Sequence, residues 1–100
     1  MAPGPVGGEL LIGAPAPGVA QVEIRDFEYE PGHVTVRVGG TVTWVNHDDF
    51  DHRLVSLEGG VVDSGTLALD GTYSHTFDRA GDFPYYDVIN NMMKGSVTVR

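Results

Sequence analysis

Apolar and polar residues alternate along several short segments of the chain. In residues 41–46 the apolar Val42 and Trp44 alternate with threonines. Residues 33–38 and 72–77 follow the same pattern. Because successive side chains of a β-strand point to opposite faces, this period of two predicts strands that are buried on one side only.

Turn-forming residues separate these segments, and no stretch has the period of an amphipathic helix. Glycine, proline and aspartate end most of the alternating segments, as at Pro31-Gly32, Gly39-Gly40 and Gly59-Gly60. From Gln21 to Arg100 the sequence predicts seven or eight short strands, which are typical of an all-β sandwich of two sheets. We expect antiparallel strands and a core that includes Val36, Val42, Trp44, Phe77, Phe83 and Val97.

The first 18 residues differ in composition from the rest. They are rich in proline, glycine and alanine, which favour a flexible arm over regular structure. One apolar island, residues 10–12, is an alternative candidate for an added edge strand. The sequence therefore predicts an arm, residues 1–18, followed by one domain, residues 19–100.

The composition excludes several classes of function. The formal net charge of −8 would repel nucleic acids and anionic membranes, and it favours a basic protein surface or a cation as partner. The absence of cysteine excludes disulfides, thiolate metal ligands and cysteine nucleophiles. No apolar run reaches the roughly 18 residues of a membrane span. No nucleophile motif or P-loop is present, so we do not expect an enzyme.

Three segments of the domain carry a family resemblance. The first runs from Phe27 through Trp44 to Asn46, the second is Asp51-His52, and the third is Ala80-Gly81-x-Phe83-x-Tyr85 followed by Met93-Lys94-Gly95. Together they resemble the cupredoxins, the small blue copper proteins that include plastocyanin, amicyanin and pseudoazurin. The resemblance implies a cupredoxin-like Greek-key β-sandwich. It also implies a periplasmic or extracellular location, with the signal or anchor outside the printed chain.

The resemblance places four residues where the family holds its copper. Asp87 stands at the thiolate position, His52 and Asn90 at the two imidazole positions, and Met93 at the axial methionine position. The family spacing Cys-x-x-His-x-x-Met is kept, but only His52 and Met93 keep the ligand type. A blue type 1 site needs a thiolate and two imidazoles, so blue copper and its electron transfer are not expected. The resemblance also implies that Asn46 ties the two ligand loops together by hydrogen bonds.

Three hypotheses for function follow from this degenerate copper site. The chain is a non-redox binding or structural module, which we favour. Alternatively, His52 and Asp87 form a non-blue site that binds Cu(II) or Zn(II) weakly, with Asn90 as a further donor. A third hypothesis is an electron-transfer copper protein whose ligand loop has been engineered.

The surroundings of these residues suggest one further partner site. In the family the corresponding pole is the docking surface, which predicts a protein partner at the pole formed by Phe50, Met92 and Met93. The nearby acidic residues Asp48, Asp49 and Asp51 lack the register of a calcium-binding loop, so we expect them to be a solvated acidic loop.

Overall fold

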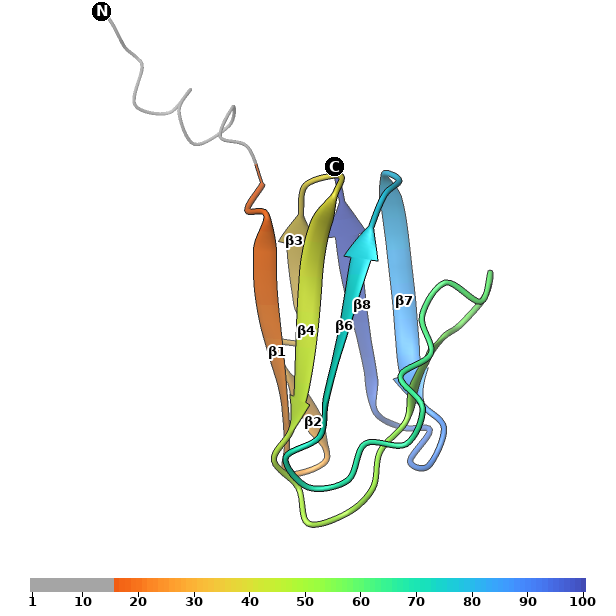
Figure 1. Cartoon of the computed structure of the whole chain (residues 1–100). Coiled ribbons are helices and arrows are strands. Elements are labelled where there is room, and N and C mark those ends of the chain that lie inside the picture. Colours follow the sequence, from red (N-terminus) through yellow and green to blue (C-terminus); the bar gives the residue numbers. More distant parts are fainter. Residues whose placement is uncertain (1–15) are drawn as a thin grey trace, which may run out of the picture.

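The computed structural model describes residues 16–100, which form two packed β-sheets (Figure 1). The strands are β1 (Val19–Arg25), β2 (Glu28–Glu30), β3 (His33–Val36), β4 (Gly40–Asn46), β5 (Leu54–Ser56), β6 (Thr72–Phe77), β7 (Gly81–Asp87) and β8 (Lys94–Val99). The predicted all-β sandwich of seven or eight strands is confirmed. The predicted island at residues 10–12 and most of the predicted arm lie outside the described residues. Within the described residues, no helix is long and apolar enough to span a membrane.

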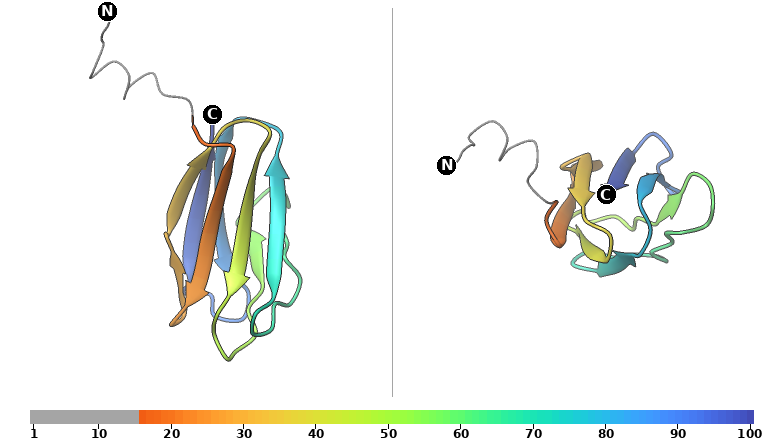
Figure 2. Two further views of the ribbon diagram at one scale, coloured as in Figure 1. Left: turned by 60° about the vertical axis from the view of Figure 1, so that its left-hand side comes forward. Right: turned by 90° about the horizontal axis from the view of Figure 1, so that it is seen from above.

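The strand order shows which segments become neighbours. One sheet has the order β2-β1-β4-β6 and the other β3-β8-β7-β5 (Figure 2). The pairs β1–β4 and β3–β8 are parallel, whereas the remaining neighbours are antiparallel. Antiparallel pairing is expected over most of residues 21–100, and four of the six strand pairs are antiparallel; the other two, β1–β4 and β3–β8, are parallel. The alternation of side chains shows which face of a strand is buried, but it carries no information on the direction of the neighbouring strand.

The core lies between the sheets and is built from the inward residues of the alternating segments. On β4 the even-numbered residues Val42 and Trp44 are fully buried, while the threonines between them are only half-buried. Trp44 packs edge to face against Tyr85 of the other sheet, with ring centroids 5.4 Å apart. Of the six residues predicted in the core, five are buried and Phe83 is partly buried against them.

Four connecting segments meet at one end of the sandwich, at the lower end in Figure 1. Because β1 and β4 are parallel, Ile24 and Asn46 lie side by side at this end, and the His47 N–H donates to the Ile24 carbonyl at 2.8 Å. β7 also ends here, where Asp87 pairs with Leu54. We call this end the loop pole. It consists of residues 26–27, 47–53, 64–71 and 87–93.

Candidate functional site

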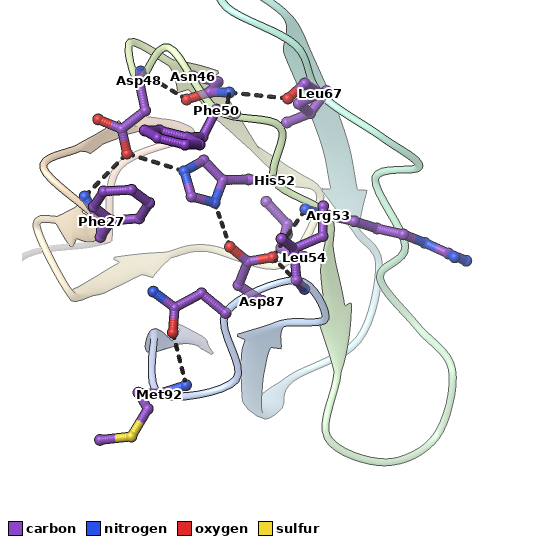
Figure 3. A network of polar contacts seen from close by, with 12 residues as sticks. Phe27, Asn46, Asp48, Phe50, His52, Arg53, Leu54, Leu67, Asp87 and Met92 are labelled. Carbon is purple, nitrogen blue, oxygen red and sulfur yellow. Dashed lines mark hydrogen bonds and ion pairs between the residues drawn. The ribbon is translucent and has the colours of Figure 1, made fainter.

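A fully buried histidine, His52, lies at the centre of the loop pole between two carboxylates (Figure 3). Its Nδ1 contacts Oδ2 of Asp87, and its Nε2 lies 2.9 Å from Oδ2 of Asp48. Asp87 is 0% exposed and Asp48 is 8% exposed. Both nitrogens of the imidazole are thus engaged by acidic side chains of the same chain.

Asp87 is held by its neighbours as well as by His52. Its Oδ1 accepts hydrogen bonds from the backbone N–H groups of Arg53 and Ile89, each at 3.0 Å. Its own N–H donates to the carbonyl of Met93 at 3.0 Å, which closes residues 87–93 into a compact loop. The carboxylate therefore joins the loop after β7 to the segment that leads into β5.

Asp48 corrects the expectation of a solvated acidic loop. Asp49 and Asp51 are exposed as expected, but Asp48 turns inward and is buried. Its carboxylate accepts the N–H groups of Asp26 at 2.7 Å and Phe27 at 3.0 Å. Both of these residues have a positive φ, 55° and 60°, in a turn that contains no glycine. The two hydrogen bonds hold this left-handed turn in place.

The pKa of Asp48 reflects these competing effects. Burial by itself raises the pKa, because it disfavours the charged carboxylate. The N–H of Phe27, the His52 ring and the N–H of Asp26 outweigh burial, and the net pKa lies below the usual value of an aspartate. Asp48 is therefore an ionised acceptor at neutral pH. The sequence alone does not single out Asp48, because the three acidic residues of this loop are equivalent until the turn at residues 26–27 covers one of them.

Asn46 ties loops together, but not the pair that the resemblance implies. Its side-chain nitrogen donates to the carbonyls of Phe50 at 2.8 Å and Leu67 at 2.9 Å. Its side-chain oxygen accepts the N–H of Asp48 at 2.8 Å. Asn46 thus joins residues 47–53 to residues 64–71. The link to residues 87–93 is made instead by His52 and Asp87.

The other two predicted site residues take different positions. The side-chain oxygen of Asn90 accepts the N–H of Met92 at 3.4 Å, within its own loop. Met93 is 5% exposed and belongs to the apolar core. Of the four residues at copper-ligand positions, the structure joins His52 and Asp87 directly.

Exposed apolar side chains surround this buried network. They are Phe27, Phe50, Val88, Ile89 and Met92, which we call the apolar pole. Met92 is 84% exposed, and the rings of Phe27 and Phe50 lie 5.1 Å apart over the network. The expectation that Met93 adds to this surface is wrong, because Met93 is buried.

A hollow and several charges complete the surface of the loop pole. A hollow of about 320 Å³ opens between Phe27, Asn90 and Met92. Four exposed acidic residues lie beside the apolar pole, namely Asp26, Glu28, Asp49 and Asp51. Lys94 is an exposed cation on the rim of the hollow. The surface therefore combines an apolar centre with a mainly acidic border.

Two four-stranded sheets with their loops gathered around a buried histidine define a β-sandwich of the cupredoxin class. The family described as "Copper binding proteins, plastocyanin/azurin family" matches residues 17–100, and the chain belongs to this family.

Curated relatives and solved structures agree with this assignment. The chain is 36% identical to amicyanin of Paracoccus denitrificans over 92 residues, which cover 85% of this chain and 68% of the relative. It is 34% identical to plastocyanin of Scenedesmus fuscus over 84 residues, which cover 72% of this chain and 86% of the relative. A solved purple cupredoxin from Nitrosopumilus maritimus matches with a TM-score of 0.77 and 28% identity, over 81% of this chain and 99% of the other.

The donor groups of this chain do not fit the blue copper of the family. A blue site needs a thiolate, and the chain has no cysteine. Both nitrogens of His52 are already engaged by carboxylates, and Asn90 offers only a neutral amide. Among residues 16–100 there is no group of three or more His, Cys, Asp or Glu side chains that could hold a metal ion. The non-blue site on His52 and Asp87 stays a prediction, which a metal titration tests.

Proposed function

We propose that this chain is a non-redox binding module that uses the cupredoxin fold to present the apolar pole to another protein. The observation that carries the proposal is the exposure of five apolar side chains on loops that a buried polar network holds in place. Large exposed apolar patches are uncommon on soluble domains unless they bind something. The absence of a thiolate separates this function from electron transfer through blue copper.

The charges around the apolar pole indicate the chemistry of the partner. Asp26, Glu28, Asp49 and Asp51 are exposed at its border, and the whole chain has a net charge of −8. A second copy of the chain would bring like charges together at this surface. The partner therefore has an apolar patch bordered by lysine or arginine, and it lies outside the cytoplasm, as the family resemblance implies.

The test uses a photo-cross-linking residue introduced at one position at a time in the organism that makes the chain. Met92 is replaced in the apolar pole, and Val38 is replaced as the matched control. Val38 is also an exposed apolar residue, but it lies in the turn between β3 and β4 at the opposite end of the sandwich. We expect one specific cross-linked protein from position 92 and none from position 38.

A second measurement separates specific docking from nonspecific adhesion. The Debye length falls from about 10 Å at 0.1 M salt to about 3 Å at 1 M. Binding of the cross-linked partner should therefore weaken over that range, and Ile89→Ser should weaken it further, while Val38→Ser leaves it unchanged. Equal cross-linking from both positions, or none from position 92, would contradict the proposal.

A further inference from the structure

The edge strand β6 presents a row of backbone groups that have no partner. β6 ends its sheet and pairs with β4 on one side (Figure 1). The carbonyls of Gly71 and Phe77, at the two ends of β6, accept backbone hydrogen bonds from the β4 side at 2.9 and 2.6 Å. Because backbone groups alternate in direction along a strand, those of Thr72, Ser74 and Thr76 point away from β4. Among residues 16–100, no segment pairs with this outer side of β6.

The other edges of the two sheets are shorter or covered. β2 and β5 have three residues each and β3 has four, whereas β6 has six. Residues 62–64 also lie against β5, where they form backbone hydrogen bonds with Leu54 and Ser56. Sheet edges are commonly protected by lysine, proline or a bulge, and β6 has none of these. The residues of β6 whose backbone points outward are exposed, so β6 is the longest open edge of the described sandwich.

A hollow of about 400 Å³ lies beside this edge. Its apolar lining comes from Phe77 of β6, Phe83 of β7 and Val61. The side chains of a strand added to β6 would alternate between two faces. One set would face this hollow, and the other would lie next to a row of hydroxyl groups on the outer face of the sheet, where Ser74 and Thr76 hydrogen-bond to threonines of β4.

The charges beside the hollow indicate what kind of strand fits there. Asp78 and Arg79 line the hollow, and Glu58 and Asp82 line an adjoining hollow of about 270 Å³ that shares Arg79 with it. All four side chains are exposed, and three carboxylates and one guanidinium sum to −2. A second copy of the chain, with its own net charge of −8, would bring like charges together. The charges therefore favour a basic segment of another protein.

We propose that β6 accepts an extended segment of another protein as an added strand. The backbone of this segment hydrogen-bonds to Thr72, Ser74 and Thr76. Its apolar side chains face the hollow, its serines or threonines lie on the outer face, and a lysine or arginine near one end pairs with Asp78. Strand addition of this kind takes its affinity from main-chain hydrogen bonds and its specificity from pockets for alternate side chains.

This edge is separate from the apolar pole. β6 begins at the loop pole but runs away from it, so that Phe77 pairs with Gly40 at the opposite end of β4. The hollow beside Phe77 and Asp78 is therefore remote from Met92. The inference does not depend on the function proposed for the apolar pole.

The test combines the full chain with a short synthetic peptide in which valine alternates with threonine between two terminal lysines. Amide hydrogen exchange is followed by NMR with and without the peptide. In the free chain, the amides of Thr72, Ser74 and Thr76 should exchange rapidly. Saturating peptide should slow their exchange at least about tenfold. The signals of Met92 in the apolar pole should stay unchanged.

A pair of variants at one position tests the role of the backbone. Ser74→Pro removes an outward N–H but no hydrogen bond between β4 and β6, and Ser74→Thr keeps that N–H. We expect Ser74→Pro to lower the affinity for the peptide at least about tenfold and Ser74→Thr to change it less than about twofold. Trp44 fluorescence checks that each variant is folded. Thr76→Lys, which places a charge at the same edge without changing the backbone, should also lower the affinity.

Three results would overturn the inference. One is equal peptide affinity of the edge variants, Ser74→Pro and Thr76→Lys, and of Ser74→Thr. Another is protection of the three outward amides in the free chain, because the edge would then already be covered by another segment or by a second copy. The third is no binding of the peptide at about millimolar concentration. None of these results bears on cross-linking from position 92, which tests the apolar pole.

Discussion

Replacing Gly95 with alanine should destabilise the fold at one identifiable contact. Gly95 on β8 pairs with Tyr85 on β7. A Cβ at Gly95 would lie within 3.0 Å of the Tyr85 ring carbons and hydroxyl oxygen, a separation that real Cβ atoms essentially never show. Tyr85 is buried edge to face between Tyr29, at 4.8 Å, and Trp44, at 5.4 Å. The ring therefore cannot move aside without disturbing two other aromatic residues.

The size of the effect follows from two opposing terms. Overpacking a well-filled core costs about 1–3 kcal/mol, and the severity of this contact places Gly95→Ala in the upper part of that range. Against this, replacing glycine by alanine restricts the unfolded chain and stabilises the fold by about 0.4–1 kcal/mol. The net loss is then about 2 kcal/mol. For a domain of this size, such a loss lowers Tm by about 8–16 °C.

Urea denaturation followed by tryptophan fluorescence measures this loss. Trp44 is the single tryptophan of the chain and lies in the core, so its emission reports the global transition. Gly32→Ala is the matched control, because a Cβ there has only the Tyr29 carbonyl oxygen nearby, at 3.8 Å. Because the same restriction of the unfolded chain acts at position 32 without a clash, the control should be between neutral and about 1 kcal/mol more stable than the parent. Combining Gly95→Ala with Tyr85→Leu should cost less than the sum of the two single changes. A stability of Gly95→Ala equal to that of Gly32→Ala would refute the reasoning.

Two further predictions concern charge and metal chemistry. The side chain of Arg53, followed by the N–H of Gly65, holds the pKa of Asp63 at about 2 instead of 3.8. The stabilisation from the exposed Arg53–Asp63 pair is therefore present above about pH 3.8 and is lost as the pH falls through about 2. In Arg53→Gln the midpoint of the Asp63 titration, followed by NMR, should rise; an unchanged midpoint would contradict the role of Arg53. Addition of Cu(II) to the parent chain should give no intense visible absorption, while Asp87→Cys combined with Asn90→His should give a blue site; a colourless, folded double variant would show that the loop backbone has diverged too.

The strands could be predicted from the sequence more fully than their arrangement. Alternation identified β4 and β6 because one face of each strand is more deeply buried than the other. Alternation could not reveal the turn between β1 and β2. There Asp26 and Phe27 have positive φ values, which are usually adopted by glycine. That turn depends on the carboxylate of Asp48, which comes from more than 20 residues further along the chain.

The site could be predicted in part, for a similar reason. The family resemblance correctly placed His52 near Asp87, because the loops after β4 and β7 leave the sandwich at the same end. The sequence did not show which of two neighbouring residues of the same type is buried and which is exposed. Met92 is exposed and Met93 is buried, and Asp48 is buried while Asp49 is exposed. These differences arise from the direction of the backbone within each loop, which the residue types alone do not reveal.

The position of β8 within its sheet has a consequence for synthesis of the protein in the cell. β8 is a central strand that pairs with β3 on one side and with β7 on the other, yet of the eight strands of this sandwich it is synthesised last. Until residues 94–99 emerge, β3 has no partner within its sheet and the nascent chain exposes unpaired strand edges. The sandwich therefore closes only after translation has passed Val99, and chains that stop before Lys94 should be aggregation-prone and dependent on chaperones.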